Sequence, residues 1–181
     1  HMDENFLRSL NPGASWTAGE QITVVEPVVP GERVLDTLAH IVVDKARGRL
    51  VALDHDGAVI GDYPVTIGSS GTPSPTGTHK VVAVAMNPTY HYSPDNFVQG
   101  ENMQPLTLPP GPNGPVGSVW IDLDAPSYGL HGTPRPEKLF VTASHGCVRL
   151  TNWDAQELAA MVNARMAVEP GAQIDVTFSD G

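Results

Sequence analysis

The sequence contains a single cysteine, Cys147, among its 181 residues. A single cysteine excludes an internal disulfide, a four-cysteine zinc site and a CxxC redox pair. Taken alone, such a residue is expected to be a buried and unreactive core thiol. A chemical role for Cys147 therefore depends on its neighbours, and His145 stands two positions before it.

Basic residues are also scarce, because 10 Lys and Arg face 20 Asp and Glu, which gives a net charge of -10. A nucleic-acid partner would require a clustered basic face and is excluded, as is simple attraction to anionic membranes or cell-wall polymers. No apolar run in the sequence approaches the about 20 residues of a membrane span. Length and composition are typical of one soluble globular domain, which we expect to be a monomer.

The first 30 residues differ in character from the rest. His1-Met2 is typical of a cloning remnant, so we expect a targeting signal to have been removed. Residues 10–13, LNPG, and 19–24, GEQITV, resemble the closing segment of a LysM-type glycan-binding module. Residues 1–30 are therefore predicted to be an N-terminal arm, either a LysM-type remnant or an ordered segment packed on the main domain.

The main domain is predicted to be mostly β, because 18 Gly and 17 Pro are spread along the chain and supply many turns. Turns are expected at residues 45–48 and at Asp56-Gly57. The strands are predicted at residues 41–43, 50–53, 59–67, 80–85, 118–123 and 174–178. Between them, residues 87–117 show no periodicity, and a loop of this length in a compact domain is usually functional.

One main helix is predicted directly after the cysteine. Residues 151–154, TNWD, have the form of a capping box. Small and apolar residues then recur at helical spacing, which predicts one buried face. They are Ala155, Leu158, Ala159 and Val162.

The residues around Cys147 predict a nucleophilic site. A cysteine attacks as a thiolate, and a nearby imidazole can take its proton. His145 shares a face with Cys147 in an extended segment, whereas His131 is distant in sequence and is free to approach from another strand. Gly146 permits a tight backbone before the nucleophile, which would present its own N–H and that of Cys147 to an oxyanion.

Three segments carry a resemblance to a known family. Residues 128–152, with YGLHGT at one end and SHGCVRLTN at the other, resemble the active-site signature of the L,D-transpeptidase (YkuD-like) catalytic domain. Residues 72–78, TPSPTGT, and 111–117, GPNGPVG, resemble two further segments of that family. The likeness extends over residues 38–178, and it implies an L,D-transpeptidase-like β-sandwich or sheet fold.

The resemblance also implies an activity. Cys147 would attack peptidoglycan stem peptides at the third residue, usually diaminopimelate, and would release the terminal D-alanine. The acyl group would then pass to an amine, in cross-linking or in protein attachment. Such an enzyme works in the periplasm or outside the cell, and it needs neither cofactor nor metal. β-Lactams of the carbapenem class are expected to acylate its thiol.

The family's site residues map onto this sequence by position. His131 becomes the general base, and the backbone carbonyl of Gly132 orients its ring. The residues expected to contact substrate are Ser144, His145, Tyr128 and Arg149, whose planar guanidinium suits a carboxylate.

Three alternatives stay open. A hydrolase of the L,D-carboxypeptidase or amidase type would use the same Cys-His site with water as the acceptor. A zinc-dependent hydrolase would bind its metal through His131, His145 and Cys147, although no fourth ligand is evident. A non-catalytic cell-wall-binding module would leave the cysteine and histidines without a purpose.

Overall fold

The computed structural model describes residues 4–24, 35–92, 104–140 and 144–180. The chain divides into two compact units, His1–Glu32 and Arg33–Gly181. In the first unit, helix α1 (Glu4–Leu10) is followed by a loop. The Asn11 side chain donates to the Thr23 carbonyl at 2.8 Å and accepts from the Thr23 N–H at 2.6 Å. This side chain joins the two LysM-like stretches, and their relation to such a module stays a prediction.

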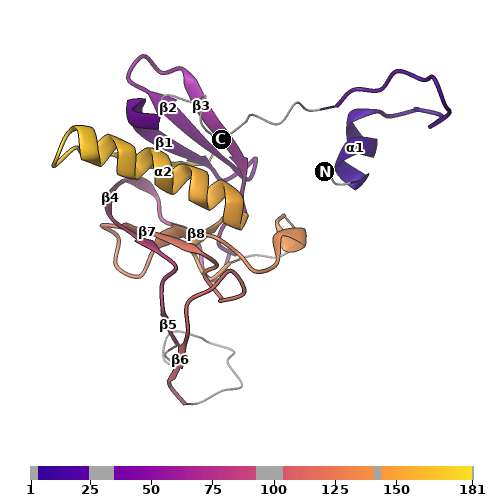
Figure 1. Cartoon of the computed structure of the whole chain (residues 1–181). Helices are drawn as coiled ribbons and strands as arrows, with labels where there is room; N and C mark the ends of the chain where they lie inside the picture. The colour runs from indigo at the N-terminus through magenta and orange to yellow at the C-terminus, as the bar shows by residue number, and fades with distance from the viewer. Residues whose placement is uncertain (1–3, 25–34, 93–103, 141–143, 181) are drawn as a thin grey trace. The chain divides into compact units, whose positions relative to one another are not determined.

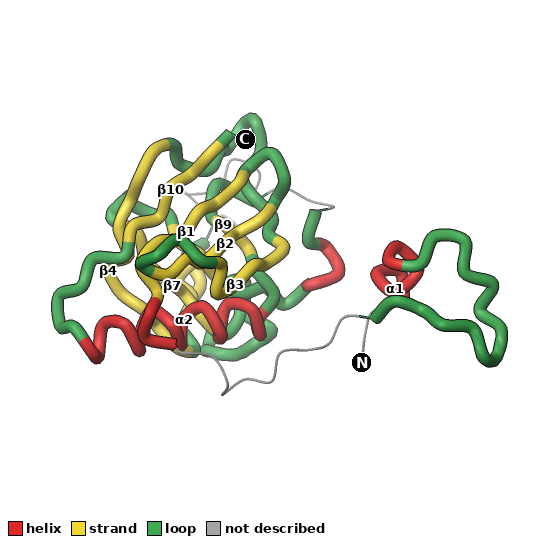
Figure 2. The backbone as a smooth tube through the Cα atoms, turned by 90° about the horizontal axis from the view of Figure 1, so that it is seen from above, coloured by secondary structure: helices red, strands yellow, loops and turns green. Residues whose placement is uncertain are grey.

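The second unit is built on one eight-stranded sheet, shown in Figures 1 and 2. Its strands, in spatial order, are β3 (Val59–Pro64), β2 (Arg49–Asp54), β1 (Leu38–Asp44), β10 (Asp175–Ser179), β4 (Gly77–Met86), β7 (Val119–Leu123), β8 (Gly129–His131) and β9 (Val148–Arg149). The pairs β1–β10 and β8–β9 are parallel, and the others are antiparallel. The predicted mostly β fold is therefore confirmed.

Helix α2 (Asn152–Val168) lies against the sheet and covers the core, as Figure 1 shows. Its N-cap is Thr151, whose Oγ1 accepts a hydrogen bond from the Asp154 N–H at 3.0 Å, as the sequence pattern predicted. The helix buries Leu158 and Val162 against the core. A short 3₁₀ turn, η1 (Leu35–Thr37), precedes β1 and contacts α2. None of the helices among the described residues is long and apolar enough to cross a membrane.

The segment after β3 differs from the prediction of one strand over residues 59–67. The strand ends at Pro64. The next residues leave β2, and Thr66 exchanges two backbone hydrogen bonds of 2.9 Å with Arg149 in β9. Because β3 and β9 stand at opposite ends of the strand order, these bonds require a curled sheet. The curl brings the segment after β3 against the strand that follows Cys147.

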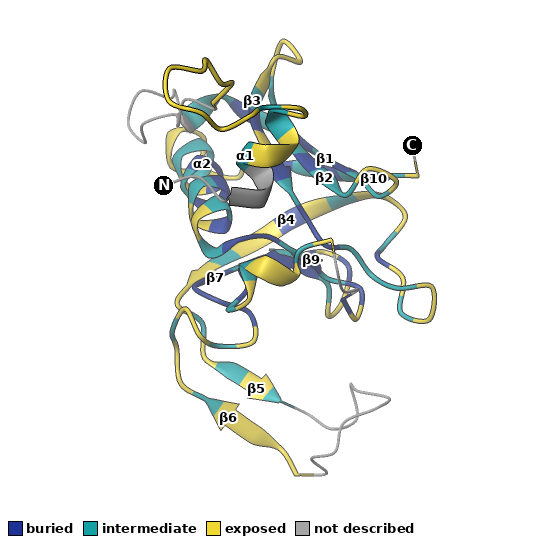
Figure 3. Cartoon of the chain, turned by 90° about the vertical axis from the view of Figure 1, so that its right-hand side faces the viewer, coloured by how far each residue is buried: buried dark blue, intermediate teal, exposed yellow. Residues whose placement is uncertain are grey.

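The long segment of residues 87–117 also differs from the prediction, since part of it is regular. Strands β5 (Tyr90–Tyr92) and β6 (Leu106–Leu108) form a separate two-stranded hairpin. Figures 1 and 3 show that this hairpin projects away from the main sheet and is largely exposed. Three-residue strands are too short to show a period in the sequence. Residues 93–103 of the segment lie outside the described part.

Candidate active site

Strands β8 and β9 bring the predicted nucleophile and base together at one end of the sheet. They pair in parallel, with His131 opposite Arg149 and Leu130 opposite Val148. Side chains alternate along a strand, so His131 and Arg149 project from the same face. Cys147 stands two residues before Arg149 and shares that face. His131 and Cys147 are therefore diagonal neighbours across one strand pair.

The His131 ring is buried and held in one orientation. It is 5 % exposed, and its Nδ1–H donates to the Gly132 carbonyl at 2.6 Å. The ring also stacks on Trp120, with centroids 5.6 Å apart. Burial lowers the pKa of His131 to about 4, assisted by the positive charge of Arg149, whereas the hydrogen bond to Gly132 opposes this shift. The imidazole is therefore neutral at physiological pH, and its Nε2 lone pair is available to accept a proton.

The Cys147 thiol is partly buried. Burial raises its pKa, and the negative charge of Asp122 adds to that effect. A hydrogen bond with the Gly129 backbone and the charge of Arg149 act in the opposite direction on the thiol pKa. The Sγ–H donates to the Ser127 carbonyl at 3.6 Å. The resting nucleophile is thus a protonated thiol bonded to a backbone carbonyl and not to the imidazole.

Ser127 is a site residue that the sequence analysis missed. Its φ of 69° lies in the left-handed region, which is uncommon for a residue other than glycine. Strained backbone of this kind is concentrated at functional sites. At Ser127 it accompanies the carbonyl that accepts the hydrogen bond of the thiol, and no pattern in the sequence signals such a conformation.

Gly146 has the tight backbone that was predicted, but its N–H is engaged elsewhere. Its φ is +113°, and an added Cβ would lie 2.5 Å from the Tyr128 ring. The Gly146 N–H donates to the Ser144 Oγ at 3.0 Å, so in this structure it is not available to an oxyanion. The Cys147 N–H has no acceptor among the described residues and is the backbone donor left for that role.

The remaining signature residues, Ser144, Tyr128 and His145, differ in how far they are buried. Ser144 is 3 % exposed, and its hydroxyl bonds to the Cys147 carbonyl inside the loop. This geometry assigns Ser144 to the loop scaffold, in place of the substrate contact expected from the sequence. Tyr128 is half-buried against Gly146. His145 is exposed, whereas His131 is buried, which separates the two histidines.

Asn152 is a second residue whose role the sequence did not reveal, because it was assigned to the helix cap and to the end of the signature segment without a contact of its own. Its Oδ1 accepts from the Ser118 N–H at 3.0 Å, and its Nδ2 donates to the Pro112 carbonyl at 3.0 Å. An added Cβ would lie 2.2 Å from Asn152 Oδ1 at Gly132 and 2.0 Å from it at Gly117. Asn152 therefore ties the start of α2 to the long segment and to the residue whose carbonyl orients the imidazole.

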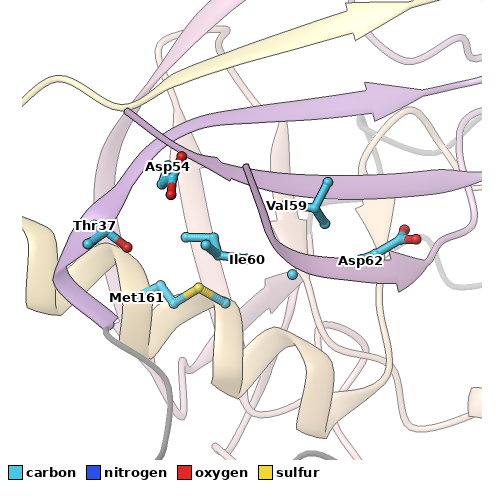
Figure 4. Close-up of a pocket in the computed structure, with 7 residues that line it drawn as sticks. Thr37, Asp54, Val59, Ile60, Asp62 and Met161 are labelled. Atoms are coloured by element: carbon cyan, nitrogen blue, oxygen red, sulfur yellow. The ribbon is translucent and has the colours of Figure 1, made fainter. Parts of the chain in front are cut away.

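Two cavities lie at different ends of the sheet. One of about 230 Å³ is lined by Arg149, by the buried Thr66 and Thr133 and by Arg135 and Lys138. A larger cavity of about 600 Å³ lies between β3 and α2, and Figure 4 shows its lining of small acidic and apolar side chains. Its described lining includes neither cysteine nor histidine. The lining of the smaller cavity also lacks Cys147 and His131, but it includes Arg149, which is paired with His131 in the β8–β9 register.

The zinc interpretation finds no ligand cluster in the described part of the chain. Nowhere among those residues do three His, Cys, Asp or Glu side chains come together as metal ligands. The His131 Nδ1 bonds to a backbone carbonyl, and His145 is exposed. The site instead contains the Cys147 thiol, the neutral His131 imidazole and the Cys147 N–H, which has no acceptor among the described residues. A nucleophile, a base and an oxyanion donor are the groups that acyl transfer requires.

Comparison with known proteins agrees with this geometry. The model of the L,D-transpeptidase catalytic domain matches residues 38–176. Two Bacillus proteins carry names of this class. YkuD of Bacillus licheniformis is 29 % identical over 167 residues, which cover 91 % of this chain and 85 % of the relative. YqjB of Bacillus subtilis is 31 % identical over 135 residues, which cover 71 % of this chain and 69 % of the relative.

Solved structures show the same fold at lower identity. The carbamoyl enzyme of Ldtfm with avibactam superposes with a TM-score of 0.55 at 23 % identity, over 78 % of this chain and 49 % of that one. L,D-transpeptidase 3 of Mycobacterium tuberculosis, in complex with a faropenem-derived adduct, superposes with a TM-score of 0.55 at 17 % identity. The superposition covers 77 % of this chain and 60 % of the mycobacterial chain. This chain thus spans between about half and two thirds of the solved chains it matches. Taken with the match to residues 38–176, these comparisons show that the chain belongs to the L,D-transpeptidase catalytic domain family, a class of acyltransferases.

Proposed function

We propose that this chain is a peptidoglycan L,D-transpeptidase that acts on stem tetrapeptides through Cys147 and His131. One observation carries the proposal. The imidazole is buried, neutral and held through Nδ1 by the Gly132 carbonyl, in the strand that pairs with β9, which begins directly after Cys147. A base that is already neutral can take the thiol proton as the sulfur attacks.

The first half of the reaction acylates the enzyme. Cys147 Sγ leaves its hydrogen bond to the Ser127 carbonyl and attacks the carbonyl carbon of the third stem residue, while its proton passes to His131 Nε2. The Cys147 N–H donates to the resulting oxyanion, and one such donor is typically worth about 3 kcal/mol of barrier. The C–N bond then breaks, and the departing D-alanine nitrogen takes the proton from His131. A thioester at Cys147 results.

The second half transfers the acyl group. An amine attacks the thioester carbonyl and gives a proton to His131 Nε2. The C–S bond breaks, and the departing thiolate recovers its proton from the imidazole. A new amide is released, with the enzyme restored. We expect carbapenem-class β-lactams to acylate the same thiol, in keeping with the faropenem-derived adduct on the mycobacterial enzyme of similar fold.

In this proposal the described parts of the long segment, residues 87–92 and 104–117, form one wall of the substrate cleft. Burial raises the pKa of the Tyr90 phenol, and the charge of Cys147 also raises it, which supports a position of β5 near the thiol. Pro115 lines the same cavity as Arg149. The backbone N–H of Asn87 donates to the Ser118 carbonyl at 2.7 Å and closes the base of the segment.

The substrate also implies a location. Stem peptides lie outside the cytoplasmic membrane, so we propose that the enzyme acts in the cell envelope, in the periplasm or outside the cell. The acceptor amine in this proposal belongs to a second stem or to an attached protein.

Incubation of the enzyme with a stem tetrapeptide tests the function. The wild type should release D-alanine and accumulate cross-linked dimer, measured by mass spectrometry. Cys147→Ser should yield neither product. His131→Gln should be about 10²- to 10⁴-fold slower, since general-base assistance is typically worth that much. His145→Gln, which alters an exposed histidine of the same loop, is the matched control and should be slowed far less.

Two outcomes would contradict parts of this assignment. Accumulation of tripeptide without dimer would identify water as the acceptor and move the enzyme to the L,D-carboxypeptidases. Loss of activity in folded His145→Gln, with His131→Gln unimpaired, would show that the base is the other histidine.

A further inference from the structure

The cavity of about 230 Å³ beside Arg149 is lined by several positively charged side chains. Arg135, Lys138 and Arg149 all line it, and its described lining contains no carboxylate. The chain has only 10 Lys and Arg against 20 Asp and Glu. Three of the ten cations therefore converge on one small cavity of an acidic protein, which indicates a site for an anion.

Within the described part of the chain, no carboxylate forms an ion pair with Arg149. Burial lowers the pKa of its guanidinium, because a charge removed from water needs a compensating partner. Among the described residues, neither Arg149 nor Arg135 has a carboxylate within salt-bridge distance. A ligand carboxylate would supply the missing partner and would gain two parallel hydrogen bonds from the planar guanidinium.

Hydrogen bonds join the residues that form the walls of the cavity. Thr66 is 4 % exposed, exchanges backbone hydrogen bonds with Arg149 and accepts the Phe140 N–H through Oγ1 at 3.0 Å. Thr133 Oγ1 accepts the Arg135 N–H at 3.2 Å and fixes the backbone that carries this arginine. The cavity is smaller than the about 300–1,000 Å³ typical of pockets for whole drug-sized ligands. It therefore suits one side chain of a peptide.

Arg149 links the cavity to the reaction centre. The charge of Arg149 acts on the pKa of the Cys147 thiol and of the His131 imidazole. Arg149 is opposite His131 in the β8–β9 register. A side-chain carboxylate bound by this guanidinium would thus lie near the reaction centre, at the distance of one long side chain from the carbonyl that the sulfur attacks.

We propose that Arg135, Lys138 and Arg149 form a subsite for the free side-chain carboxylate of the third stem residue, and that this subsite selects substrates. The inference rests on the proposed function for its choice of peptide. Arg149 contributes the desolvated bidentate contact, and the two exposed cations raise the local potential at the mouth. Stem peptides whose third residue lacks this carboxylate, because it is amidated or is lysine, are poor substrates.

Three tetrapeptides distinguish the side-chain carboxylate of the third residue from the terminal carboxylate of D-alanine. One is unmodified, one carries an amide in place of the third residue's side-chain carboxylate, and one ends in D-alaninamide. Amidation of the third residue should lower kcat/KM about 10- to 100-fold, the range expected for a lost charge-assisted hydrogen bond. D-Alaninamide should change it much less. A loss confined to D-alaninamide would assign the cavity to the terminal carboxylate and overturn the proposal.

Variants of the two cavity-mouth cations test the assignment without altering the catalytic pair. Arg135→Gln and Lys138→Gln should each reduce the preference for the free carboxylate about two- to five-fold, as expected for exposed ion pairs, and the double variant should combine the two losses. The matched control is Arg47→Gln with Lys80→Gln, which removes the same two charges from exposed positions outside the cavity lining. This control should leave the preference unchanged. An equal effect of both double variants would reduce the cavity to general electrostatics and contradict the proposal.

Calorimetric binding to Cys147→Ser separates failure of the subsite from failure of the proposed function. The unmodified peptide should bind this inactive variant more tightly than the third-residue amide. Turnover of both peptides at equal rates would refute the subsite and leave the transpeptidase proposal standing. Selective binding to Cys147→Ser without turnover by the wild type would support the subsite and refute the proposed function.

Discussion

His131 illustrates how burial sets the chemistry of a single residue. A cysteine protease with an ion pair at rest needs a charged imidazole, but burial lowers the pKa of His131 to about 4. The Cys147 thiol is shifted the other way, since burial raises its pKa. Both shifts favour the neutral thiol and imidazole, so the proton moves only when the sulfur attacks.

This pKa shift predicts a pH dependence of stability. The folded-state pKa of His131 is about 4 and its ordinary value is 6.5, so the unfolded chain binds the additional proton between these values. Stability is thus retained above pH 6.5 and falls as the pH drops toward 4. The full shift corresponds to about 3 kcal/mol. Urea unfolding at pH 7 and pH 4.5 should show this loss for the wild type.

His131→Gln removes the titrating group and serves as the comparison. Other carboxyl groups titrate in the same pH range in both proteins, so the difference between them isolates His131. The variant should lose less stability than the wild type over this interval. Equal losses in the two proteins would mean that the imidazole is not buried in its neutral form.

At the scale of elements, the start of α2 positions the site without contacting substrate. Asn152 is the first residue of the helix, and its side chain bonds to Ser118 before β7 and to Pro112 in the long segment. Gly132 lies so close to its Oδ1 that no Cβ fits between them. The helix that stabilises the core therefore also sets the position of the carbonyl that orients His131.

Asn152→Ala should therefore impair both stability and turnover. The Ser118 N–H would lose its acceptor, and an unsatisfied donor of this kind costs about 1–3 kcal/mol. kcat should fall with little change in KM, because the ring of His131 would lose its fixed orientation. Thermal unfolding and steady-state kinetics measure the two effects.

Asn163→Ala provides the control, because Asn163 is an exposed asparagine in the same helix. It should leave kcat unchanged and should not destabilise the protein, since alanine is the better helix former. If Asn152→Ala loses stability but keeps the wild-type kcat, Asn152 is a structural residue alone.

At the scale of the whole molecule, the core belongs to one unit. All the buried hydrophobic residues of the described chain lie between Leu38 and Phe178. The unit Arg33–Gly181 therefore contains the complete sheet, helix α2 and the reactive pair. The first unit contributes none of these elements.

A chain that begins at Arg33 should accordingly fold and react as the whole chain does. The melting temperature and the rate of Cys147 acylation should match those of residues 1–181, because no core residue has been removed. Calorimetry and intact-mass spectrometry on the two proteins, prepared in parallel, give these values. A markedly lower melting temperature of the shorter chain would show that residues 1–32 stabilise the catalytic unit.

The sequence by itself determined the elements whose causes are local. The apolar segments at 41–43, 50–53 and 59–67 and the turns at 45–48 and Asp56-Gly57 predicted the first hairpins, and the cap at Thr151 predicted the start of α2. The signature segment identified the family, and with it the fold. These features depend on residues a few positions apart, so they can be predicted from the sequence alone.

The tertiary structure alone decided what depends on distant partners. The curl of the sheet joins Thr66 to Arg149, and burial under the packed strands makes His131 neutral. The loop around Cys147 turns the Gly146 N–H toward Ser144, which leaves the Cys147 N–H for the oxyanion. A hydrogen-bond partner, a desolvated charge and a cavity all arise from residues far apart in the chain, because they exist only after the sheet has closed around them.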